Sequence, residues 1–462
     1  MANFFKENTK KQVSKKTNKI DCITIDKLDL NGCGVGRYQK KPIFVTGSLP
    51  NEVVEVRIAE KKNKYILAKL LKINKVNEFR VAAQCKHFTL CGGCDLQHYD
   101  YKEQLLFKQK KVAELFSRSG VSSEVISHLP WQNTVESSQW HYRRKARIGV
   151  QFDRNSQAIV GFRQKATNQL VAIKSCPILI KPACDIFPLL NKLLAKLTVK
   201  KAIGHIEVIA TDITDDNVGK LQLVVRQIRS INTADRQLWQ EYAEKHAWTV
   251  QFVESKNTQE NTHQEESSTI ESSQGGLSYQ LLDDIRINFS TTDFIQINEP
   301  VNLAMIAQAL TWLALDPNDQ ILDLFCGLGN FSLPLAKKVA NVVGIEGVQV
   351  MVDRASANAK ANNIDNCQFF QADLNSSWSS NHWAKENYTK ALLDPARAGA
   401  EHAVEQICEL NIATVLYVSC DPTTLARDSQ VLLTKGYKIT KIGLIDMFAQ
   451  TKHVETMVLF QR

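Results

Sequence analysis

The chain has 462 residues, which at about 100–200 residues per domain predicts two to four domains. Hydrophobic residues make up 44% and charged residues 23%, ordinary proportions that exclude a fibrous protein and disorder throughout. No stretch approaches the roughly 18 uninterrupted apolar residues of a membrane span. The N-terminus is basic and polar and has no apolar core of the kind that makes a secretory signal. We therefore expect a cytoplasmic protein with no membrane partner.

Positive charge is concentrated in the N-terminal part of the chain. The formal net charge is +9. Residues 1–150 contain 28 basic and 14 acidic side chains, a formal +14, which leaves −5 for residues 151–462. Charge alone leaves two interpretations open: a part that grips a polyanion joined to a part with another task, or an ordinary solvated lysine-rich surface.

A basic tail is expected at residues 1–16, followed by a small β-barrel domain at residues 17–76. The strands and the turn of this barrel are predicted at Ile20–Ile25, a glycine-rich turn Asn31–Gly36, Lys41–Val45, Asn51–Ile58 and Tyr65–Leu70. Several short strands at near-regular spacing are typical of such a barrel. Its loops contain the basic residues Lys40, Lys41, Lys61, Lys62 and Lys64. These loops would suit a nucleic-acid-binding barrel of the oligonucleotide-binding kind.

Eleven scattered cysteines argue against a disulfide framework and for metal binding or catalysis at a few positions. Cys85, Cys91 and Cys94 fall within ten residues, and the two glycines between the last two let the backbone fold tightly around one metal centre. The fourth ligand must come from elsewhere, with Cys176 as the first candidate and Cys184 as the reserve. Four thiolates suit zinc or an iron–sulfur cluster, and the three-plus-one layout favours the cluster, because zinc sites usually come as two CxxC pairs. Reduced structural cysteines are the remaining alternative.

Residues 77–289 are interpreted as a central domain that holds the cysteine cluster, a helix at Tyr101–Leu115 and a region rich in β patterns at 130–253. Within it, Trp140–Arg147 interleaves aromatic and basic side chains. This pattern fits base stacking beside phosphate contacts, or equally a solvated strand face. Residues 254–276 are polar, low in complexity and without periodicity, which predicts a disordered surface insertion rather than a site.

From residue 290 to 462 the pattern changes to strand–helix alternation. Seven strands are predicted, at Gln320–Leu324, Asn341–Ile345, Gln368–Gln371, Lys390–Leu393, Thr414–Ser419, Tyr437–Ile445 and Glu455–Leu459. Helical segments between several of them predict a doubly wound α/β fold with a mostly parallel sheet. No helix separates the last two strands, so we expect them to pair antiparallel.

The first of these strands runs into a glycine turn, at Ile321–Asn330, before a helix that begins near Phe331. Glycines let a ligand approach the backbone at the carboxyl end of a strand. The next strand ends at Glu346, where a carboxylate can accept hydrogen bonds from two ribose hydroxyls. Asp373 follows the strand after it, where an adenine edge would lie. The turn lacks the third glycine of the dinucleotide fingerprint, so S-adenosylmethionine is favoured over NAD.

Three further motifs lie at the same rim. The sequence DPAR at 394–397 stands where amino-group methyltransferases carry Asp or Asn before Pro-Pro and an aromatic residue, which argues against transfer to an amine. The sequence SCDP at 419–422 puts Cys420 at a strand end that faces the crevice; without that context such a cysteine is more often an inert small hydrophobe. Glu455 begins the last strand, where a glutamate usually faces solvent.

Together these residues resemble the RNA uracil-5-methyltransferase family, and within it the iron–sulfur members that act on bacterial 23S ribosomal RNA and carry an N-terminal TRAM barrel. The resemblance covers nearly the whole chain, and the DPAR and SCDP motifs together are specific. Members that act on transfer RNA are expected to lack both barrel and cluster. The insertion at 254–276 lies outside the family pattern.

The resemblance implies a class I, Rossmann-like S-adenosylmethionine-dependent methyltransferase domain, 23S ribosomal RNA as the partner, and no obligate protein partner. It implies one [4Fe–4S] cluster, held by Cys85, Cys91, Cys94 and Cys176. It also implies a cofactor site that begins at Phe294–Asn298, with cofactor contacts at Gln296, Phe325, Asn330, Glu346, Asp373 and Asp394. Asp394 would also bind the base. Cys420 matches the nucleophile, and Glu455 the general base.

The chemistry of methylation at uracil C5 gives an independent reason for a nucleophile and a base such as Cys420 and Glu455. Uracil C5 is a poor nucleophile, but a thiolate that adds to C6 makes an enolate, whose C5 can attack the sulfonium methyl. A carboxylate must then remove the C5 proton before the thiol leaves. The base must also leave its stack, which explains separate RNA-gripping domains. The cluster is expected to shape the RNA-binding domain, with redox sensing as an alternative.

Two other functions stay open. One is a non-catalytic RNA-binding or ribosome-assembly factor that retains a nucleotide-binding fold. The other is an iron–sulfur radical enzyme, which ranks last because its CxxxCxxC spacing is absent.

Overall fold

The structure is a computed structural model that describes residues 19–210, 221–254, 267–269 and 277–462. The chain divides into two compact units, Met1–Ala82 with His98–Asp100 and Ala83–Gln97 with Tyr101–Arg462. Among the described residues, no helix combines the length and the apolar character needed to cross a membrane. The predicted basic tail lies outside the described residues, as does most of the predicted insertion.

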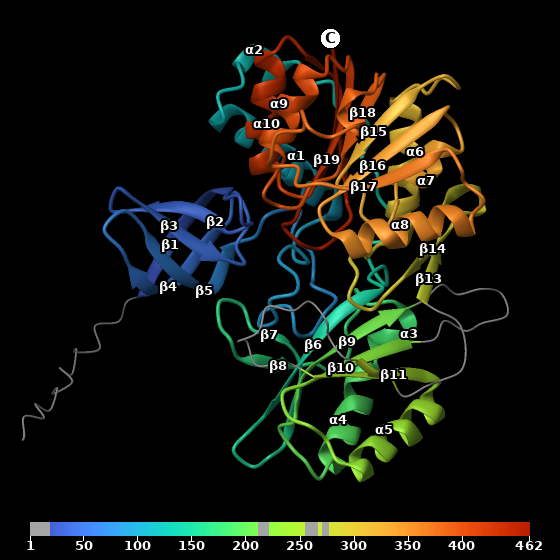
Figure 1. The fold of residues 1–462 in the computed structure, drawn as a ribbon. Helices are drawn as coiled ribbons and strands as arrows, with labels where there is room; N and C mark the ends of the chain where they lie inside the picture. Colours follow the sequence, from blue (N-terminus) through green and yellow to red (C-terminus); the bar gives the residue numbers. More distant parts are fainter. Residues whose placement is uncertain (1–18, 211–220, 255–266, 270–276) are drawn as a thin grey trace, which may run out of the picture. The chain divides into compact units, whose positions relative to one another are not determined.

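The first unit is a closed five-stranded barrel with the strand order β1-β2-β3-β5-β4, drawn in blue in Figure 1. Its strands are β1 (Lys19–Leu28), β2 (Gly34–Tyr38), β3 (Lys41–Thr46), β4 (Val53–Lys61) and β5 (Ile66–Lys75). The parallel pairing of β3 with β5 is part of the closure. The core of the barrel consists of alternate apolar residues, Ile23, Ile25, Ile43, Val45, Val54, Val56, Ile66 and Ala68. The predicted barrel is therefore confirmed.

Strand β2 lies partly in the segment predicted as a glycine-rich turn. The turn itself is shorter, and Asp29 Oδ1 accepts a hydrogen bond from the Cys33 amide at 2.8 Å to close it. A Cβ added at Gly36 would lie 2.3 Å from the carbonyl oxygen of Thr24 on β1. This glycine serves the close approach of two strands, a role that a sequence pattern cannot distinguish from a turn.

The second unit contains a central sheet of seven strands, in the order β12-β11-β10-β9-β6-β7-β8. These are β6 (Lys145–Phe152), β7 (Ala158–Arg163), β8 (Leu170–Ala172), β9 (Ile203–Ala210), β10 (Leu221–Gln227), β11 (Trp248–Glu254) and β12 (Ser267–Thr269). Three helices accompany them, α3 (Lys181–Cys184), α4 (Ile186–Lys196) and α5 (Thr233–His246). The structure differs from the predicted disordered insertion at β12, which pairs antiparallel with β11.

The C-terminal sheet has the order β17-β16-β15-β18-β19-β21-β20. Its strands are β15 (Gln320–Leu324), β16 (Asn341–Glu346), β17 (Cys367–Gln371), β18 (Lys390–Leu393), β19 (Thr414–Ser419), β20 (Lys438–Ile445) and β21 (Glu455–Gln461). The five strands β15–β19 are parallel, and β21 lies antiparallel between β19 and β20. Both the doubly wound sheet and its antiparallel end are therefore as predicted.

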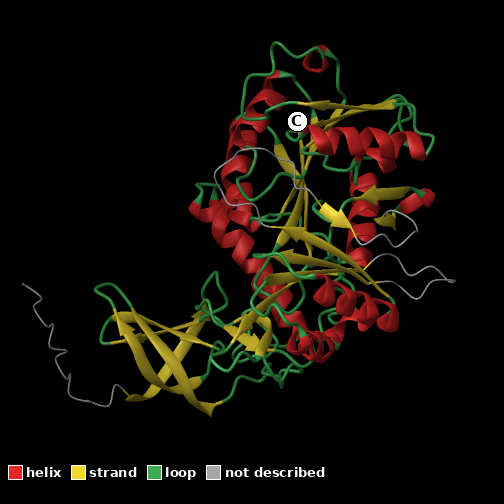
Figure 2. Ribbon diagram, turned by 60° about the horizontal axis from the view of Figure 1, so that its bottom comes forward, coloured by secondary structure: helices red, strands yellow, loops and turns green. Residues whose placement is uncertain are grey.

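Helices cover both faces of this sheet, as Figures 1 and 2 show. They are α6 (Glu299–Trp312), α7 (Ser332–Ala336), α8 (Gln349–Ala361), α9 (Glu401–Glu409) and α10 (Pro422–Thr434). Helix α1 (Tyr101–Arg118) packs against α10 and β20, and the short helix α2 (Ser123–Ser127) packs against α1. The connection into the sheet is a hairpin of β13 (Leu277–Gln280) and β14 (Arg286–Phe289), with the 3-10 turn η1 (Leu282–Asp284) between them. A second 3-10 turn, η2 (Trp383–Lys385), precedes β18.

The segment Trp140–Arg147 joins the central sheet to the C-terminal sheet. The Tyr142 hydroxyl is buried and donates to the carbonyl oxygen of Ala449 at 2.9 Å. Arg144 is also buried, and its Nε donates to the carbonyl oxygen of Gln296 at 2.9 Å. Base stacking beside phosphate contacts and a solvated strand face would both require these side chains to face solvent. Tyr142 and Arg144 instead pack inside the unit.

Candidate active site

The carboxyl ends of the parallel strands surround a cavity of about 460 Å³. Seven of the eight residues predicted for cofactor binding and catalysis line it, namely Gln296, Phe325, Asn330, Glu346, Asp394, Cys420 and Glu455. The aromatic side chain of Phe294 also lines the cavity, although it is 71% exposed. The fold thus brings together residues as far apart in the chain as Gln296 and Glu455, because parallel strands present their carboxyl ends at one edge.

The glycine turn after β15 forms one wall and contains unusual backbone. Phe325, Gly327 and Gly329 have φ angles of 62°, 56° and 90°, and a left-handed conformation at the non-glycine Phe325 carries strain of a kind that clusters at ligand sites. The Glu346 carboxylate is anchored beside the turn, because its Oε2 accepts from the Gly327 amide at 3.1 Å and its Oε1 from the Val348 amide at 3.2 Å. The carboxylate retains further lone pairs for a ligand.

Asn330 is held by two residues that the sequence analysis did not single out. Its amide exchanges two hydrogen bonds with the amide of Asn302 on α6, at 3.0 and 2.9 Å. The Tyr279 hydroxyl on β13 donates to the same Asn330 oxygen at 3.4 Å. The position of Asn302 between the apolar residues Val301 and Leu303 was the available sequence signal, since a buried amide requires a polar partner.

Asp373 is not among the residues that line the cavity. Its side chain is exposed and caps its own turn, accepting from the Asn375 amide at 3.0 Å and the Ser376 hydroxyl at 2.8 Å. These hydrogen bonds hold the pKa of Asp373 below its ordinary value. Its place at a strand end was predictable, whereas the direction of its side chain depends on the loop that follows.

Two carboxyl groups in the cavity have strongly raised pKa values. Burial raises the pKa of Asp394 to about 7. Burial, with help from Asp394 and Asp446, raises the pKa of Glu455 to about 8, and Lys108 opposes that rise. Both groups therefore change protonation near neutral pH, which is the property that a general acid or base needs. Glu455 Oε2 is buried and accepts no hydrogen bond from any described residue, so this oxygen is available to a ligand.

The thiol of Cys420 lies in the same cavity, after β19. Burial raises its pKa to about 11, Glu455 and Asp394 add to the effect, and Arg397 opposes it. The resting thiol is therefore protonated at neutral pH, and it becomes a nucleophile when positive charge arrives or when a neighbouring carboxylate takes its proton.

A polar network fixes the Cys420 turn against the DPAR loop. Asp428 on α10 has no exposed surface, and its Oδ2 accepts from the Ala400 amide at 2.7 Å and from the Tyr417 hydroxyl at 2.6 Å. Arg427 donates to the carbonyl oxygen of Ala398 at 3.1 Å. The network joins the helix after the Cys420 turn to the segment after DPAR, and the ARD sequence that supplies it, at 426–428, is separated from SCDP by Thr423–Leu425.

The four predicted metal ligands also share a cavity, of about 210 Å³, lined by Cys85, Cys91, Cys94 and Cys176. The reserve ligand Cys184 is not among the lining residues. Burial raises the pKa of Cys94 to about 12 and of Cys176 to about 11. Within the described ranges, however, no three His, Cys, Asp or Glu side chains lie close enough to hold a metal ion. All eleven cysteines are free.

Comparison with known families gives two matches. Residues 100–462 match the family model described as tRNA (uracil-5-)-methyltransferase, and residues 17–71 match the TRAM domain. The 23S rRNA (uracil(1939)-C(5))-methyltransferase RlmD of Colwellia psychrerythraea is 56% identical over 477 residues, covering 100% of this chain and 99% of that protein. The RlmD protein of Psychromonas ingrahamii is 42% identical over 463 residues, covering 100% of both.

A solved structure resembles almost the whole chain. The tRNA (uracil-54, C5)-methyltransferase of Pyrococcus abyssi, in complex with S-adenosyl-L-homocysteine, aligns with a TM-score of 0.72 and covers 95% of this chain and 100% of that one. The two sequences are 21% identical, so the likeness concerns the fold.

Proposed function

This chain belongs to the tRNA (uracil-5-)-methyltransferase family, and from that premise we propose that it transfers a methyl group from S-adenosylmethionine to C5 of a uridine in 23S ribosomal RNA. The family and the TRAM barrel expected from the sequence are confirmed. The chain is an enzyme, a 23S rRNA (uracil-C5)-methyltransferase, as are its full-length relatives by name. One observation carries the catalytic part of the proposal: Cys420, Asp394 and Glu455 share one cavity with the glycine turn.

S-adenosylmethionine would occupy the side of the cavity that the glycine turn forms. The Glu346 carboxylate faces the turn and would accept hydrogen bonds from the ribose hydroxyls. Gln296, Phe325 and Asn330 line the same cavity and would contact the rest of the cofactor. Asp373 remains a predicted adenine contact, which requires that its side chain turn away from Asn375 and Ser376.

Cys420 would begin the reaction by adding to C6 of the uracil ring. The C5–C6 double-bond electrons move toward O4, and C5 of the resulting enolate then takes the methyl group while the C–S bond of the donor breaks. Glu455 accepts the C5 proton, the C5–C6 double bond re-forms, and the bond between C6 and the Cys420 sulfur breaks. The products are methylated uridine, S-adenosylhomocysteine and one proton. The raised pKa of Glu455, about 8, supports its role as the base, because it makes the carboxylate a better proton acceptor than an exposed glutamate.

Binding of the cofactor and the uracil would stabilise the thiolate form of Cys420. The pKa of Cys420 is about 11, partly because Glu455 and Asp394 are close. A sulfonium cation placed in the cavity would stabilise the thiolate, and a hydrogen bond that the Asp394 carboxylate accepts from the uracil N3–H would offset part of the opposing negative charge. The exposed ring of Phe294 at the same cavity offers a stacking face for a base that has left its helix.

RNA binding is assigned to the barrel domain at 17–76 and the central domain at 77–289, with methyl transfer in the domain at 290–462. The formal +14 of residues 1–150 supports this division. The compact units differ from this division in two respects: the central and C-terminal domains belong to a single unit, and residues 77–82 and 98–100 belong to the first unit.

A [4Fe–4S] cluster held by Cys85, Cys91, Cys94 and Cys176 is part of the proposal. The four side chains line one cavity, which fits a cluster, because a cubane is wider than a single ion and separates its ligands. A single zinc ion is less favoured, because zinc sites usually come as two CxxC pairs and this chain has a three-plus-one layout. The cluster would fix the fold of the cysteine loop.

A trapping experiment tests the reaction. In 23S RNA fragments with 5-fluorouridine in place of uridine, Glu455 has no C5 proton to remove, so the bond between Cys420 and C6 should persist. We expect one denaturant-stable protein–RNA adduct, formed only when S-adenosylmethionine is present, on a denaturing gel.

Matched variants identify the thiol. Cys420→Ser should form no adduct and should still bind S-adenosylmethionine by calorimetry, whereas Cys326→Ala, which removes another thiol from the cavity wall, should keep the adduct. Full methyl transfer by Cys420→Ser would refute the mechanism, and no transfer by the wild type to any ribosomal RNA would favour a non-catalytic assembly factor.

A further inference from the structure

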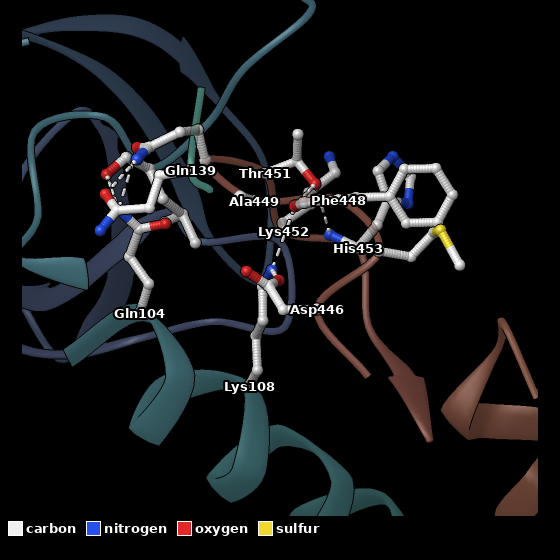
Figure 3. A network of polar contacts seen from close by, with 12 residues as sticks. Gln104, Lys108, Gln139, Asp446, Phe448, Ala449, Thr451, Lys452 and His453 are labelled. Carbon is white, nitrogen blue, oxygen red and sulfur yellow. Dashed lines mark hydrogen bonds and ion pairs between the residues drawn. The ribbon is translucent and has the colours of Figure 1, made fainter. Parts of the chain in front are cut away.

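The loop between β20 and β21, residues 446–454 and here called the base loop, ends directly before Glu455 and is held by side chains from outside the sheet (Figure 3). The carbonyl oxygen of Gln450 accepts from the amides of Asp95 and Leu96, both at 3.1 Å. The Tyr142 hydroxyl donates to the carbonyl oxygen of Ala449 at 2.9 Å. The base loop is therefore a fixed element, although it is a connection rather than a helix or strand.

Lys108 makes the charged contact to this loop. Its Nζ reaches from α1 to Asp446 Oδ1 at 2.5 Å and to the carbonyl oxygen of Phe448 at 3.2 Å, as Figure 3 shows. Lys108 and Asp446 are only 2% and 3% exposed. The second carboxylate oxygen of Asp446 accepts from the Tyr101 hydroxyl at 2.7 Å. Removing two charges from water is costly, so a buried ion pair is weak evidence of a role in stability alone.

The pair lies next to Glu455 in the sheet. Asp446 follows Ile445, and Ile445 is the cross-strand partner of Glu455 in the β20–β21 ladder. A shift of Asp446 would therefore move the strand position opposite the base. α1 precedes the predicted methyltransferase domain by about 170 residues in the sequence, so only the tertiary structure connects Lys108 with Glu455.

We propose that Lys108 and Asp446 are a positioning pair for methyl transfer, which fixes the base loop and sets the charge around Glu455 at the step in which the C5 proton leaves. This inference rests on the proposed role of Glu455 as the base. Neither residue lines the cavity, so both act through Glu455.

The charged and titratable groups around Glu455 come from four elements. Asp394 follows β18, Cys420 follows β19, Asp446 follows β20, and Lys108 belongs to α1. Burial and the carboxylates of Asp394 and Asp446 raise the pKa of Glu455, while the Lys108 cation lowers it. Cys420 is protonated at rest. Two further groups act at one remove, Arg397 beside Cys420 and Tyr101 on Asp446.

The two members of the pair should therefore shift the pH dependence in opposite directions. Glu455 accepts a proton only as a carboxylate, so the rate of adduct breakdown rises with pH through its pKa and then levels off. Lys108→Met removes the cation and should move this rise to higher pH by about one unit, whereas Asp446→Asn removes an anion and should move it to lower pH by a similar amount. The double variant should return close to the wild type.

The experiment follows one turnover on unmodified 23S RNA fragments with the full-length enzyme. The decay of the protein–RNA adduct is measured from pH 6 to 10, and circular dichroism verifies the fold of each variant. Lys111→Met is the matched control, because Lys111 lies on the same helix and donates to the carbonyl oxygen of Lys452 in the same loop at 3.0 Å. It should leave the position of the rise unchanged.

Glu455→Gln distinguishes a failure of the proposed base from a failure of the proposed positioning pair. If this variant accumulates no adduct on unmodified RNA, the proposed function of Glu455 fails. If it does accumulate adduct, while Lys108→Met and Asp446→Asn show the same pH dependence as Lys111→Met, the positioning role is refuted. If Lys108→Met fails to fold, Asp446→Asn and the double variant provide the test. A rise in the rate of adduct breakdown that moves to lower pH in Asp446→Asn and returns in the double variant supports the pair. Unchanged pH profiles overturn it.

Discussion

At the scale of single residues, burial sets the chemistry of the thiols in both cavities. The pKa of Cys420 is raised to about 11 and that of Cys94 to about 12, in each case mainly by burial. A thiol in the first cavity must lose its proton to attack a ring, and a thiol in the second must lose it to bind a metal. In the proposed function this cost would be met by different partners, a cationic substrate in the first cavity and an iron–sulfur cluster in the second.

The four cysteines that line the second cavity predict its iron and sulfide content. Protein purified without oxygen should contain about four iron and four sulfide ions per chain. Cys176→Ser should lose most of the iron, because Cys176 lines the cavity with Cys85, Cys91 and Cys94. Cys184→Ser is the control and should retain iron, since Cys184 is not a lining residue. Iron and zinc analysis with visible absorbance provides the measurement, and one zinc per chain would contradict the prediction.

At the scale of elements, α10 carries both the Cys420 turn and the clamp on the DPAR loop. Asp421 caps the start of the helix, because its side chain accepts from the Thr423 amide at 2.9 Å, and Pro422 occupies the first helical position. Two turns later, Asp428 binds the Ala400 amide after the DPAR loop. One short helix therefore fixes the two strand ends that present the thiol and Asp394.

Loss of the hydrogen bonds that Asp428 accepts from Tyr417 and Ala400 should lower the stability of the fold. Asp428→Ala leaves the Tyr417 hydroxyl and the Ala400 amide without their buried acceptor, so we expect the free energy of unfolding to fall by about 2–4 kcal/mol. Glu401→Ala, which removes only an exposed partner of Arg427, should cost less than about 1 kcal/mol. Urea denaturation measures both, and equal losses would show that Asp428 is not the centre of the clamp.

At the scale of the whole molecule, charge and chemistry are assigned to different parts of the chain. Positive charge gathers in residues 1–150, and the cavity with Cys420 is built from residues after Ser278. Neutralising phosphates releases counterions and is sequence-independent, so the exposed lysines of the barrel, which do not line the cavity, would add affinity for RNA.

Removing charge from the barrel should therefore weaken RNA binding without altering the chemical step. The triple change Lys40→Gln, Lys61→Gln and Lys64→Gln, at exposed positions, should reduce affinity about tenfold or more and lower the slope of log affinity against log salt by about two to three. The control is Lys200→Gln, Lys245→Gln and Lys337→Gln, exposed lysines of the acidic part. Filter binding at several salt concentrations tests this, and equal slopes would refute a barrel-centred grip.

The local features of this protein could be predicted from its amino-acid pattern. The bounds of β15, β18 and β19 agree with the predicted strands to the residue, because a fully buried parallel strand is a continuous apolar run with clear ends. The residues at those ends could be expected in one cavity, since parallel strands share an edge. The residue types there were also sufficient to suggest the cofactor.

The directions of side chains and their contacts with distant residues could not be predicted in this way and depend on the folded chain. Folding turned Asp373 into its own loop, buried Tyr142 and Arg144, and made a strand of the glycine-rich segment at β2. It also brought Lys108 of α1 to Asp446, 338 residues further along the chain. Local pattern fixes which residues face a core, whereas the pairing of buried charges is settled only when separate elements pack together and each buried polar group must find a partner.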